Sequence, residues 1–329
     1  MLEMVKRFPD QLIDAMQLGE SSIIHKPNTR ATLVYVSGMG GSGIGADFVS
    51  SFIKSRCSIP YLVNKTYESP FYINSESIVI ASSYSGNTEE TLSNIESCLA
   101  KGAKLICISS GGKLIEIAQT NKLDYIQVPD HWSSPRACLG FSLVAQLFVL
   151  NKLGLINSEF KNELEDSIKL LKEETDAIQE KARHLAASLY NKLTIIYSTD
   201  RIEPVAVRFR QQINENAKRL CWHHVIPEMN HNELVGWREN KSDYCVIFLR
   251  NSDDNPRNQF RIELTKEIVS HFTGSCIEVY SKGNSLIERS LYLVHLLDYT
   301  SVYLAELNNV DPVEVKVIDF LKSSLEEGV

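Results

Sequence analysis

The sequence predicts an α/β protein of two similar domains, each a parallel sheet between helices, joined by a long helix. The first observation is length, because 329 residues exceed one ordinary core and suit two domains of roughly 100–150 residues. The second is that short continuous apolar runs alternate with helical patterns in both halves of the chain, which is typical of parallel sheets covered on both faces. The third is an amphipathic segment between the two alternating regions.

The first half predicts one domain, with a leading helix, over residues 1–154. Its strand-like runs, rich in Val, Ile and Tyr, are Thr32–Ser37, Ile59–Val63, Ser77–Ser83, Lys104–Ser109 and Tyr125–Pro129. Its helical patterns are Ser42–Lys54, Thr88–Lys101, Lys113–Asn121 and Arg136–Leu153.

A linker and a second domain complete the chain. Apolar residues at spacings of three, four or seven predict one long helix from Asn157 to Tyr190 and a linker over residues 155–191. Residues 192–329 then form the second domain. Its strand-like runs are Leu193–Ser198, Leu220–Ile226, Tyr244–Leu249 and Cys276–Ser281, and its helical patterns are Glu203–Arg219, Asn258–Phe272 and Ser285–Glu306. A last helix is expected over Pro312–Glu327, with Asp311 as its cap.

Composition excludes several classes of protein. A net charge of −7 argues against a dedicated nucleic-acid surface, and no apolar run reaches the ~18 residues that a membrane helix needs. The N-terminus lacks the apolar stretch of a secretory signal. Seven scattered cysteines without a C-x-x-C pair favour a reduced, cytoplasmic protein with no structural zinc site.

A glycine loop, Gly38–Gly45, follows the first strand-like run. Gly38, Gly40 and Gly43 satisfy the G-x-G-x-x-G pattern of dinucleotide-binding folds. That pattern also needs an acidic residue at the end of the second strand, and the first acid beyond that strand is Glu68. The sequence therefore disfavours a nicotinamide enzyme and favours a backbone that approaches an anionic or hydroxyl-rich ligand. The alternative is a tight turn that touches no ligand.

A serine–threonine loop, Ser83–Thr88, follows the third strand-like run. The hydroxyls of Ser83, Ser85 and Thr88 cluster where free backbone N–H groups and the helix dipole point. The loop contains no Lys or Arg and lacks the G-K-[ST] of a nucleotide P-loop, so it suits a phosphate monoester held by neutral donors. The alternative is capping of the next helix by Asn87 or Thr88 within a capping box.

Together these loops resemble the sugar isomerase (SIS) domain. Five segments in order along the chain resemble more closely the bifunctional phosphoglucose/phosphomannose isomerase family: Gly38–Gly45, Ser83–Leu92, Pro135-Arg136, Asn214–Lys218 and Glu228–Glu233. The resemblance implies two SIS domains and an aldose–ketose isomerase that works through a cis-enediol without metal or cofactor. Its implied substrates are glucose 6-phosphate, mannose 6-phosphate and fructose 6-phosphate. The residues implied to bind the phosphosugar are Gly40, Gly41, Ser42, Ser83, Ser85 and Thr88.

The resemblance also implies the catalytic groups. Glu215 would move a proton between C1 and C2, whereas helical spacing alone favours a solvated face on which Glu215 forms a lattice with Arg208 and Gln211. Arg136, otherwise readable as a surface arginine, would neutralise the enediolate. His231 would open the sugar ring across a dimer interface, although a lone loop histidine is more often structural.

The C-terminal helix would supply a lysine, and Lys322 aligns better than Lys316. Pro312–Val315 contains no threonine where the family places one for phosphomannose activity, which weakens the expectation of mannose 6-phosphate turnover.

The expected partners are a hexose phosphate and a second copy of the chain in a homodimer with shared active sites, with no nucleic acid and no membrane. Such an enzyme would act in cytoplasmic carbohydrate metabolism, in glycolysis and gluconeogenesis. Two alternatives stay open at this point. A non-catalytic sugar-phosphate sensor would bind hexose phosphate without proton exchange, and a dinucleotide oxidoreductase would be stabilised thermally by NAD(P) and not by hexose phosphates.

Overall fold

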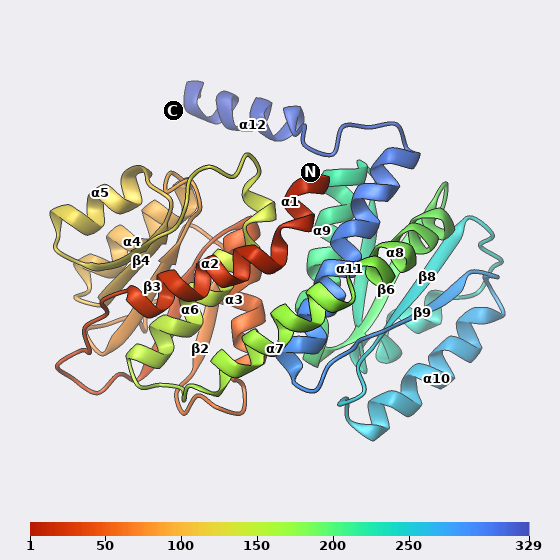
Figure 1. The fold of residues 1–329 in the computed structure, drawn as a ribbon, viewed down its shortest axis with the longest axis horizontal. Helices are drawn as coiled ribbons and strands as arrows, with labels where there is room; N and C mark the ends of the chain where they lie inside the picture. Colours follow the sequence, from red (N-terminus) through yellow and green to blue (C-terminus); the bar gives the residue numbers. More distant parts are fainter. Residues whose placement is uncertain (329) are drawn as a thin grey trace. The chain divides into compact units, whose positions relative to one another are not determined.

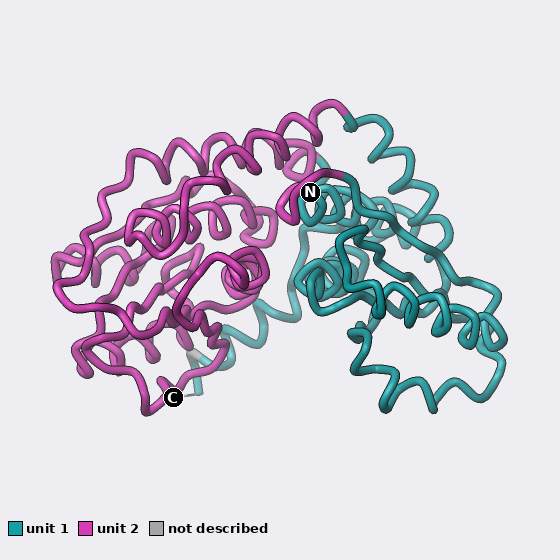
Figure 2. The backbone as a smooth tube through the Cα atoms, turned by 90° about the horizontal axis from the view of Figure 1, so that it is seen from below, with its two compact units in different colours: residues 1–2, 174–282, 289–329 teal, residues 3–173, 283–288 magenta. Residues whose placement is uncertain are grey.

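The protein is represented by a computed structural model that describes residues 1–328, apart from the side chain of Glu326. The chain forms two compact units (Figure 2). Unit 2 comprises residues 3–173 and 283–288, and unit 1 comprises residues 1–2, 174–282 and 289 onward. Each unit contains one parallel sheet with helices around it, which confirms the predicted α/β class.

Unit 2 is built on a five-stranded sheet in the order β2-β1-β3-β4-β5, with every neighbouring pair parallel. The strands are β1 (Leu33–Ser37), β2 (Tyr61–Asn64), β3 (Ser77–Ser82), β4 (Lys104–Ser109) and β5 (Asp124–Gln127). The helices are α1 (Leu2–Lys6), α2 (Phe8–Ser21), α3 (Gly40–Ile53), α4 (Glu89–Ala100), α5 (Gly112–Thr120), α6 (Leu139–Lys152) and α7 (Glu159–Glu173). The chain runs outward from β1 to β2 and in the opposite direction from β3 to β5. Right-handed crossovers therefore place α3 on one face and α4 and α5 on the other (Figure 1).

Unit 1 repeats this plan with a four-stranded parallel sheet in the order β7-β6-β8-β9. The strands are β6 (Leu193–Thr199), β7 (Cys221–Ile226), β8 (Tyr244–Arg250) and β9 (Cys276–Tyr280). The helices are α8 (Thr175–Leu189), α9 (Glu203–Ala217), α10 (Pro256–Ser270), α11 (Leu286–Leu307) and α12 (Lys316–Glu327). The same handedness places α9 and α10 on opposite faces (Figure 1).

The predicted linker helix and the predicted last helix differ from the observed ones. The expected long helix is interrupted at Glu174, whose backbone leaves the helical region (φ −94°, ψ 6°), so that α7 and α8 replace one element. The side chain of Glu174 binds Lys282 at 2.8 Å. The last helix begins at Lys316 instead of Pro312, because the Asp311 carboxylate accepts from the Val313 N–H at 2.8 Å and closes a turn there. Among residues 1–328, no helix has both the length and the apolar character that crossing a bilayer requires.

The core of unit 1 contains a histidine, and this gives a pH prediction. His295 on α11 is 1% exposed, with its ring centroid 4.8 Å from that of Tyr299. Burial lowers the pKa of His295 from 6.5 to about 3, so between these values the unfolded chain binds a proton that the native protein does not. Stability should therefore fall as the pH decreases from 6.5 towards 3, by about 2 kcal/mol from this residue at pH 5. Urea denaturation at pH 7 and pH 5 should show a smaller loss for His295→Leu than for the wild type.

The control for this prediction is His184→Leu, because the side chain of His184 on α8 is 82% exposed. We expect this variant to keep the pH dependence of the wild type. If His295→Leu shows the same pH dependence of stability as the wild type, His295 does not contribute to that dependence.

Candidate active site

The carboxyl ends of β1 and β3 form the topological switch point of unit 2. These strands are neighbours, but the chain leaves them in opposite directions along the sheet. Ligands of open parallel sheets bind in the crevice at such a switch point. The glycine loop follows β1 and the serine–threonine loop follows β3. Both loops predicted to bind ligand therefore lie at the switch point of unit 2.

The glycine loop packs closely against its surroundings. A Cβ at Gly38 would lie 2.9 Å from the carbonyl oxygen of Ser82, at the end of β3. A Cβ at Gly41 would lie 3.4 Å from the carbonyl oxygen of Pro135 and 3.7 Å from the Cα of Arg136. The loop thus contacts β3 on one side and the segment of Arg136 on the other.

Hydrogen bonds within the serine–threonine loop hold its hydroxyls together. The Oγ of Ser83 lies 2.8 Å from the Oγ1 of Thr88 and accepts from the Gly86 N–H at 3.1 Å. The exposed Ser85 Oγ accepts from the Asn87 N–H at 3.2 Å. Ser83 and Thr88 therefore come together, as a shared anion site requires.

The capping alternative for this loop is wrong. Thr88 is the residue before α4, but its hydroxyl bonds Ser83 and makes no hydrogen bond to the helix amides. The Asn87 side chain accepts from the Lys113 N–H at 3.0 Å and so links the loop to α5. The start of α4 therefore has no side-chain cap, and the hydroxyl cluster includes Thr88, the residue directly before the positive end of the helix dipole.

Gly86 fixes the shape of this loop, and its replacement gives a stability prediction. Its φ is +71°, and a Cβ there would lie 1.8 Å from the carbonyl oxygen of Gly111. Gly86→Ala should lower the free energy of unfolding by about 2–5 kcal/mol, from left-handed strain and the backbone clash. Gly40→Ala is the matched control, since Gly40 has φ +48° with no atom within 4 Å of its Cβ position. Only the strain of about 1–2 kcal/mol should apply there. Equal losses for the two variants in urea denaturation would show that the contact with Gly111 is unimportant.

Arg136 is a buried residue and not the surface arginine of the alternative interpretation. It is 8% exposed and lies in a 3-10 turn, Pro135–Ala137, ahead of α6, so the predicted helix begins later than expected. Its backbone contacts Gly41. A buried cation beside the glycine loop fits a role in stabilising negative charge.

In unit 1, Glu215 lies in the last turn of α9 and is half-buried. The polar side of α9 is not a solvated face, because Arg208 and Gln212 are buried against Asp298 of α11. The Arg208 guanidinium donates to the two carboxylate oxygens of Asp298 at 3.0 and 2.6 Å, and Gln212 donates to the same carboxylate at 3.0 Å. Asn216 donates to Ser301 at 2.9 Å. This network fixes the helix that carries Glu215.

Lys218 ends α9 in the left-handed conformation, with φ +56°. Its Nζ donates to the carbonyl oxygens of Glu215 and Glu314, both at 2.6 Å. The end of α9 is thereby tied to the segment that leads into α12, where Lys322 is exposed. His231 is exposed in a 3-10 turn, Glu228–His231, that follows β7.

The switch point of unit 1 differs from that of unit 2. The segment after β8 carries Asp253 and Asp254, and the buried Asp254 carboxylate accepts from Thr199 and Asn251, both at 2.8 Å. Asp253 binds Arg201 at 2.7 Å and Arg289 at 2.9 Å. Sequence reasoning missed this cluster, although S-D-D-N after a strand was a visible signal. The donors at this position are already bound to the two carboxylates, so the hydroxyl-lined position in unit 2 is the better candidate for a phosphate. Among residues 1–328, no group of three or more His, Cys, Asp and Glu side chains could hold a metal ion.

Comparison with known proteins gives the family. A model of the SIS domain matches residues 29–155, and a model of the bacterial phospho-glucose isomerase C-terminal SIS domain matches residues 178–325. A bifunctional phosphoglucose/phosphomannose isomerase of Caldicellulosiruptor bescii is 38% identical over 99% of both chains. The chain belongs to the bifunctional phosphoglucose/phosphomannose isomerase family. A member of this family from Aquifex aeolicus is 40% identical over 88% of this chain and 89% of that protein.

The fold of this isomerase family member is shared with more distant proteins. The C-terminal domain of glucosamine-fructose-6-phosphate aminotransferase from Francisella tularensis superposes with a TM-score of 0.74, over 94% of this chain and 97% of that chain. The two are 11% identical, so this likeness concerns the fold alone.

Proposed function

We propose that this protein is an aldose–ketose isomerase that interconverts glucose 6-phosphate with fructose 6-phosphate through a cis-enediol, without metal or cofactor. Mannose 6-phosphate would be the second aldose, and the names of the relatives support this part of the proposal. The observation that carries the proposal is the hydroxyl-lined Ser83–Thr88 loop at the switch point of unit 2, in a chain of this family. We also propose functional domains over residues 1–154 and 192–329, with 155–191 as the linker.

The phosphate group would bind in unit 2. The hydroxyls of Ser83, Ser85 and Thr88 and the uncapped amides of α4 are neutral donors at the positive end of a helix dipole. Gly40, Gly41 and Ser42, in the first turn of α3, would hold the sugar chain through close backbone approach. Neutral donors suit a phosphate monoester that must also be released.

Proton transfer would use Glu215. In the aldose-to-ketose direction its carboxylate removes the proton from C2, and the electrons of that C–H bond form the C1–C2 double bond of the enediol. The π electrons of the C1 carbonyl move to O1, which takes up a proton. The same carboxylate then returns its proton to C1, while the C2 hydroxyl gives up its proton and the carbonyl forms at C2. Arg136 would stabilise the negative charge that develops on the oxygens of the intermediate.

Ring opening would use His231, whose imidazole can exchange a proton with the ring oxygen near neutral pH. Lys322 would assist from α12. We propose that His231 acts on the substrate of a second copy of the chain, so that the enzyme is a homodimer with shared active sites and works in cytoplasmic glycolysis and gluconeogenesis.

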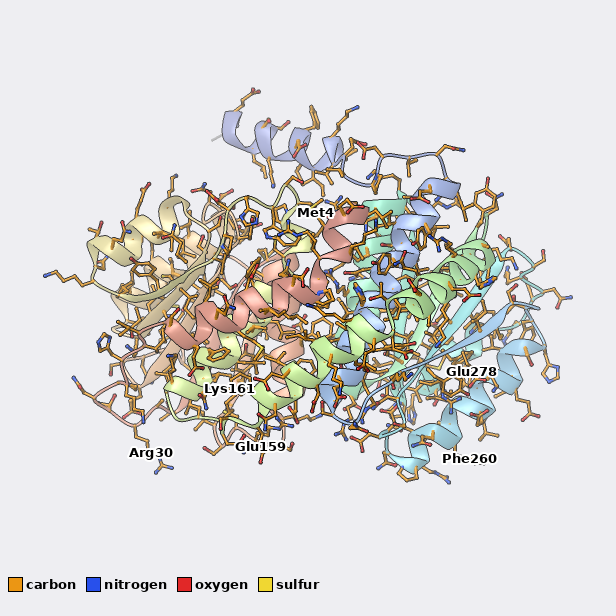
Figure 3. All side chains as sticks on the ribbon, in the orientation of Figure 1. Met4, Arg30, Glu159, Lys161, Phe260 and Glu278 are labelled. Carbon is orange, nitrogen blue, oxygen red and sulfur yellow. The ribbon has the colours of Figure 1, made fainter. Side chains whose placement is uncertain are left out.

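A surface close to His231 supports the dimer. Phe260, Leu264 and Ile268 repeat every four residues along α10, with exposures of 53%, 43% and 39%, and Figure 3 labels Phe260 on this helix. Asn230, next to His231, donates to Thr265 of α10 at 2.8 Å. A ridge of residues four apart is the surface that packs into a groove of another helix. Leu264→Glu should give a monomer by light scattering and lose activity, whereas an active monomer would contradict the shared site.

A coupled assay run in parallel on glucose 6-phosphate and mannose 6-phosphate tests the function. We expect both to yield fructose 6-phosphate, with mannose 6-phosphate slower because Pro312–Val315 lacks the threonine expected from the family. Turnover of neither aldose would contradict the proposal.

A further inference from the structure

The segment that carries His231 is fastened to unit 1 on both sides of the histidine. Met229 is fully buried in the core cluster that also contains Trp237. The Asn232 side chain donates to Glu228 at 2.8 Å and accepts from the Glu233 N–H at 2.6 Å. His231 itself is exposed between these anchors.

A further anchor of this segment is the side-chain carboxylate of Glu233. The Glu233 Oε1 accepts from the Tyr197 hydroxyl at 2.5 Å and from the Trp222 indole N–H at 3.3 Å. The Trp237 indole N–H donates to the Tyr197 oxygen at 3.1 Å. Strands β6 and β7 thus hold both ends of the segment 233–237 through one group of hydrogen-bonded side chains.

The direction of these bonds follows from the chemistry of Tyr197. Burial, reinforced by the neighbouring Glu233 carboxylate, raises the pKa of the Tyr197 phenol, which therefore keeps its proton. With Trp237 donating to its oxygen, the phenol has its own O–H to give to Glu233. A hydrogen bond to a carboxylate is shorter and stronger than one between neutral groups, so it fixes Glu233 closely.

If Glu233 had only a structural role, any hydrogen-bond acceptor for the buried Tyr197 phenol would be sufficient. A neutral acceptor would serve at lower cost, because a charge loses hydration when it enters a half-buried site. The carboxylate stands two residues from His231, in a segment otherwise held by core side chains and asparagines. A carboxylate at position 233 is explained if the imidazole of His231 must be kept in one precise position.

We infer that Tyr197 and Glu233 are positioning residues for His231, which hold its imidazole where it can act on the ring oxygen of the substrate. This inference rests on the ring-opening role of His231 in the proposed function. Misplacement of a catalytic group by about 1 Å can cost 10²-fold in rate, so loss of this bond should affect the step that His231 serves.

The test compares a substrate that must be opened with one that is already open. Glucose 6-phosphate is cyclic, whereas 5-deoxyfructose 6-phosphate lacks the hydroxyl that closes the ring and so enters as the open ketose. Tyr197→Phe and Glu233→Ala should lower kcat for glucose 6-phosphate by about 10–100-fold. Deuterium exchange at C1 of the 5-deoxy substrate should stay within about twofold of the wild type, since proton transfer at C1 and C2 does not need His231. Glu233→Gln keeps an acceptor in the same shape and should recover part of the loss.

His231→Ala is the reference variant, and it should show the same split between the two substrates. If Tyr197→Phe and Glu233→Ala slow both substrates equally, their role is structural and the inference is wrong. If His231→Ala shows the split but both of those variants have wild-type kcat on glucose 6-phosphate, the inference is again wrong while the role of His231 stands. If His231→Ala itself turns over glucose 6-phosphate normally, the ring-opening part of the proposed function fails first.

Discussion

Replacing Glu215 by Gln is expected to lower kcat for glucose 6-phosphate by about 10²–10⁴-fold, because an amide cannot take the proton from C2. The substitution keeps the shape of the side chain. It also leaves the contacts of α9 with α11 in place, because Arg208, Gln212 and Asn216 make them. Substrate affinity, measured by titration calorimetry with glucose 6-phosphate, should therefore change little.

The matched control removes the same charge elsewhere in unit 1. Glu267 is exposed on α10, and Glu267→Gln should leave kcat within about twofold of the wild type. Near-normal turnover by Glu215→Gln would mean that another group is the base. A parallel loss of affinity and kcat would instead point to a binding role for Glu215.

Replacing Asp298 by Ala is expected to lower the free energy of unfolding by about 3–5 kcal/mol, because it leaves the Arg208 guanidinium buried without its carboxylate. Arg208 and Asp298 are 3% and 5% exposed, and their two hydrogen bonds span α9 and α11. Gln212 loses its acceptor in the same variant. Urea denaturation measures the loss, and kcat should fall as well because α9 positions Glu215.

Two further variants make this prediction specific. The double replacement Arg208→Met with Asp298→Leu should recover most of the stability, since it removes both buried charges together. Glu173→Gln, which loses only an exposed partner 4.0 Å from Lys169, should change stability far less. A loss for Asp298→Ala no larger than that of Glu173→Gln would show that the buried pair is not what holds α9 to α11.

Much of the fold follows from local patterns of sequence. The run Lys104–Ser109 was predicted as a strand and is β4 with the same ends, because an apolar run rich in Ile and Leu fits a strand buried on both faces. The break at Glu174 was not predicted. The apolar spacing continues through it, from Leu171 to Ile178, while the backbone turn depends on the surrounding structure.

The predictable part of the site is the part that lies in short loops. The hydroxyls of Ser83 and Thr88 are close in sequence, so their clustering could be expected, whereas the direct hydrogen bond between them could not. Arg208 and Asp298 are 90 residues apart, and only the packing of two helices brings them together. For the same reason helical spacing suggested a solvated face for α9 where the structure has a buried one.

The central claim, proton transfer between C1 and C2 of a hexose phosphate, has a direct test. The protein is mixed with fructose 6-phosphate in deuterated water, and the hydrogens on C1 and C2 are followed by NMR. We predict that deuterium enters C1 of fructose 6-phosphate and C2 of the glucose 6-phosphate that forms, and that Glu215→Gln stops both. Binding of fructose 6-phosphate without any exchange would contradict the isomerase and leave a non-catalytic phosphosugar-binding protein.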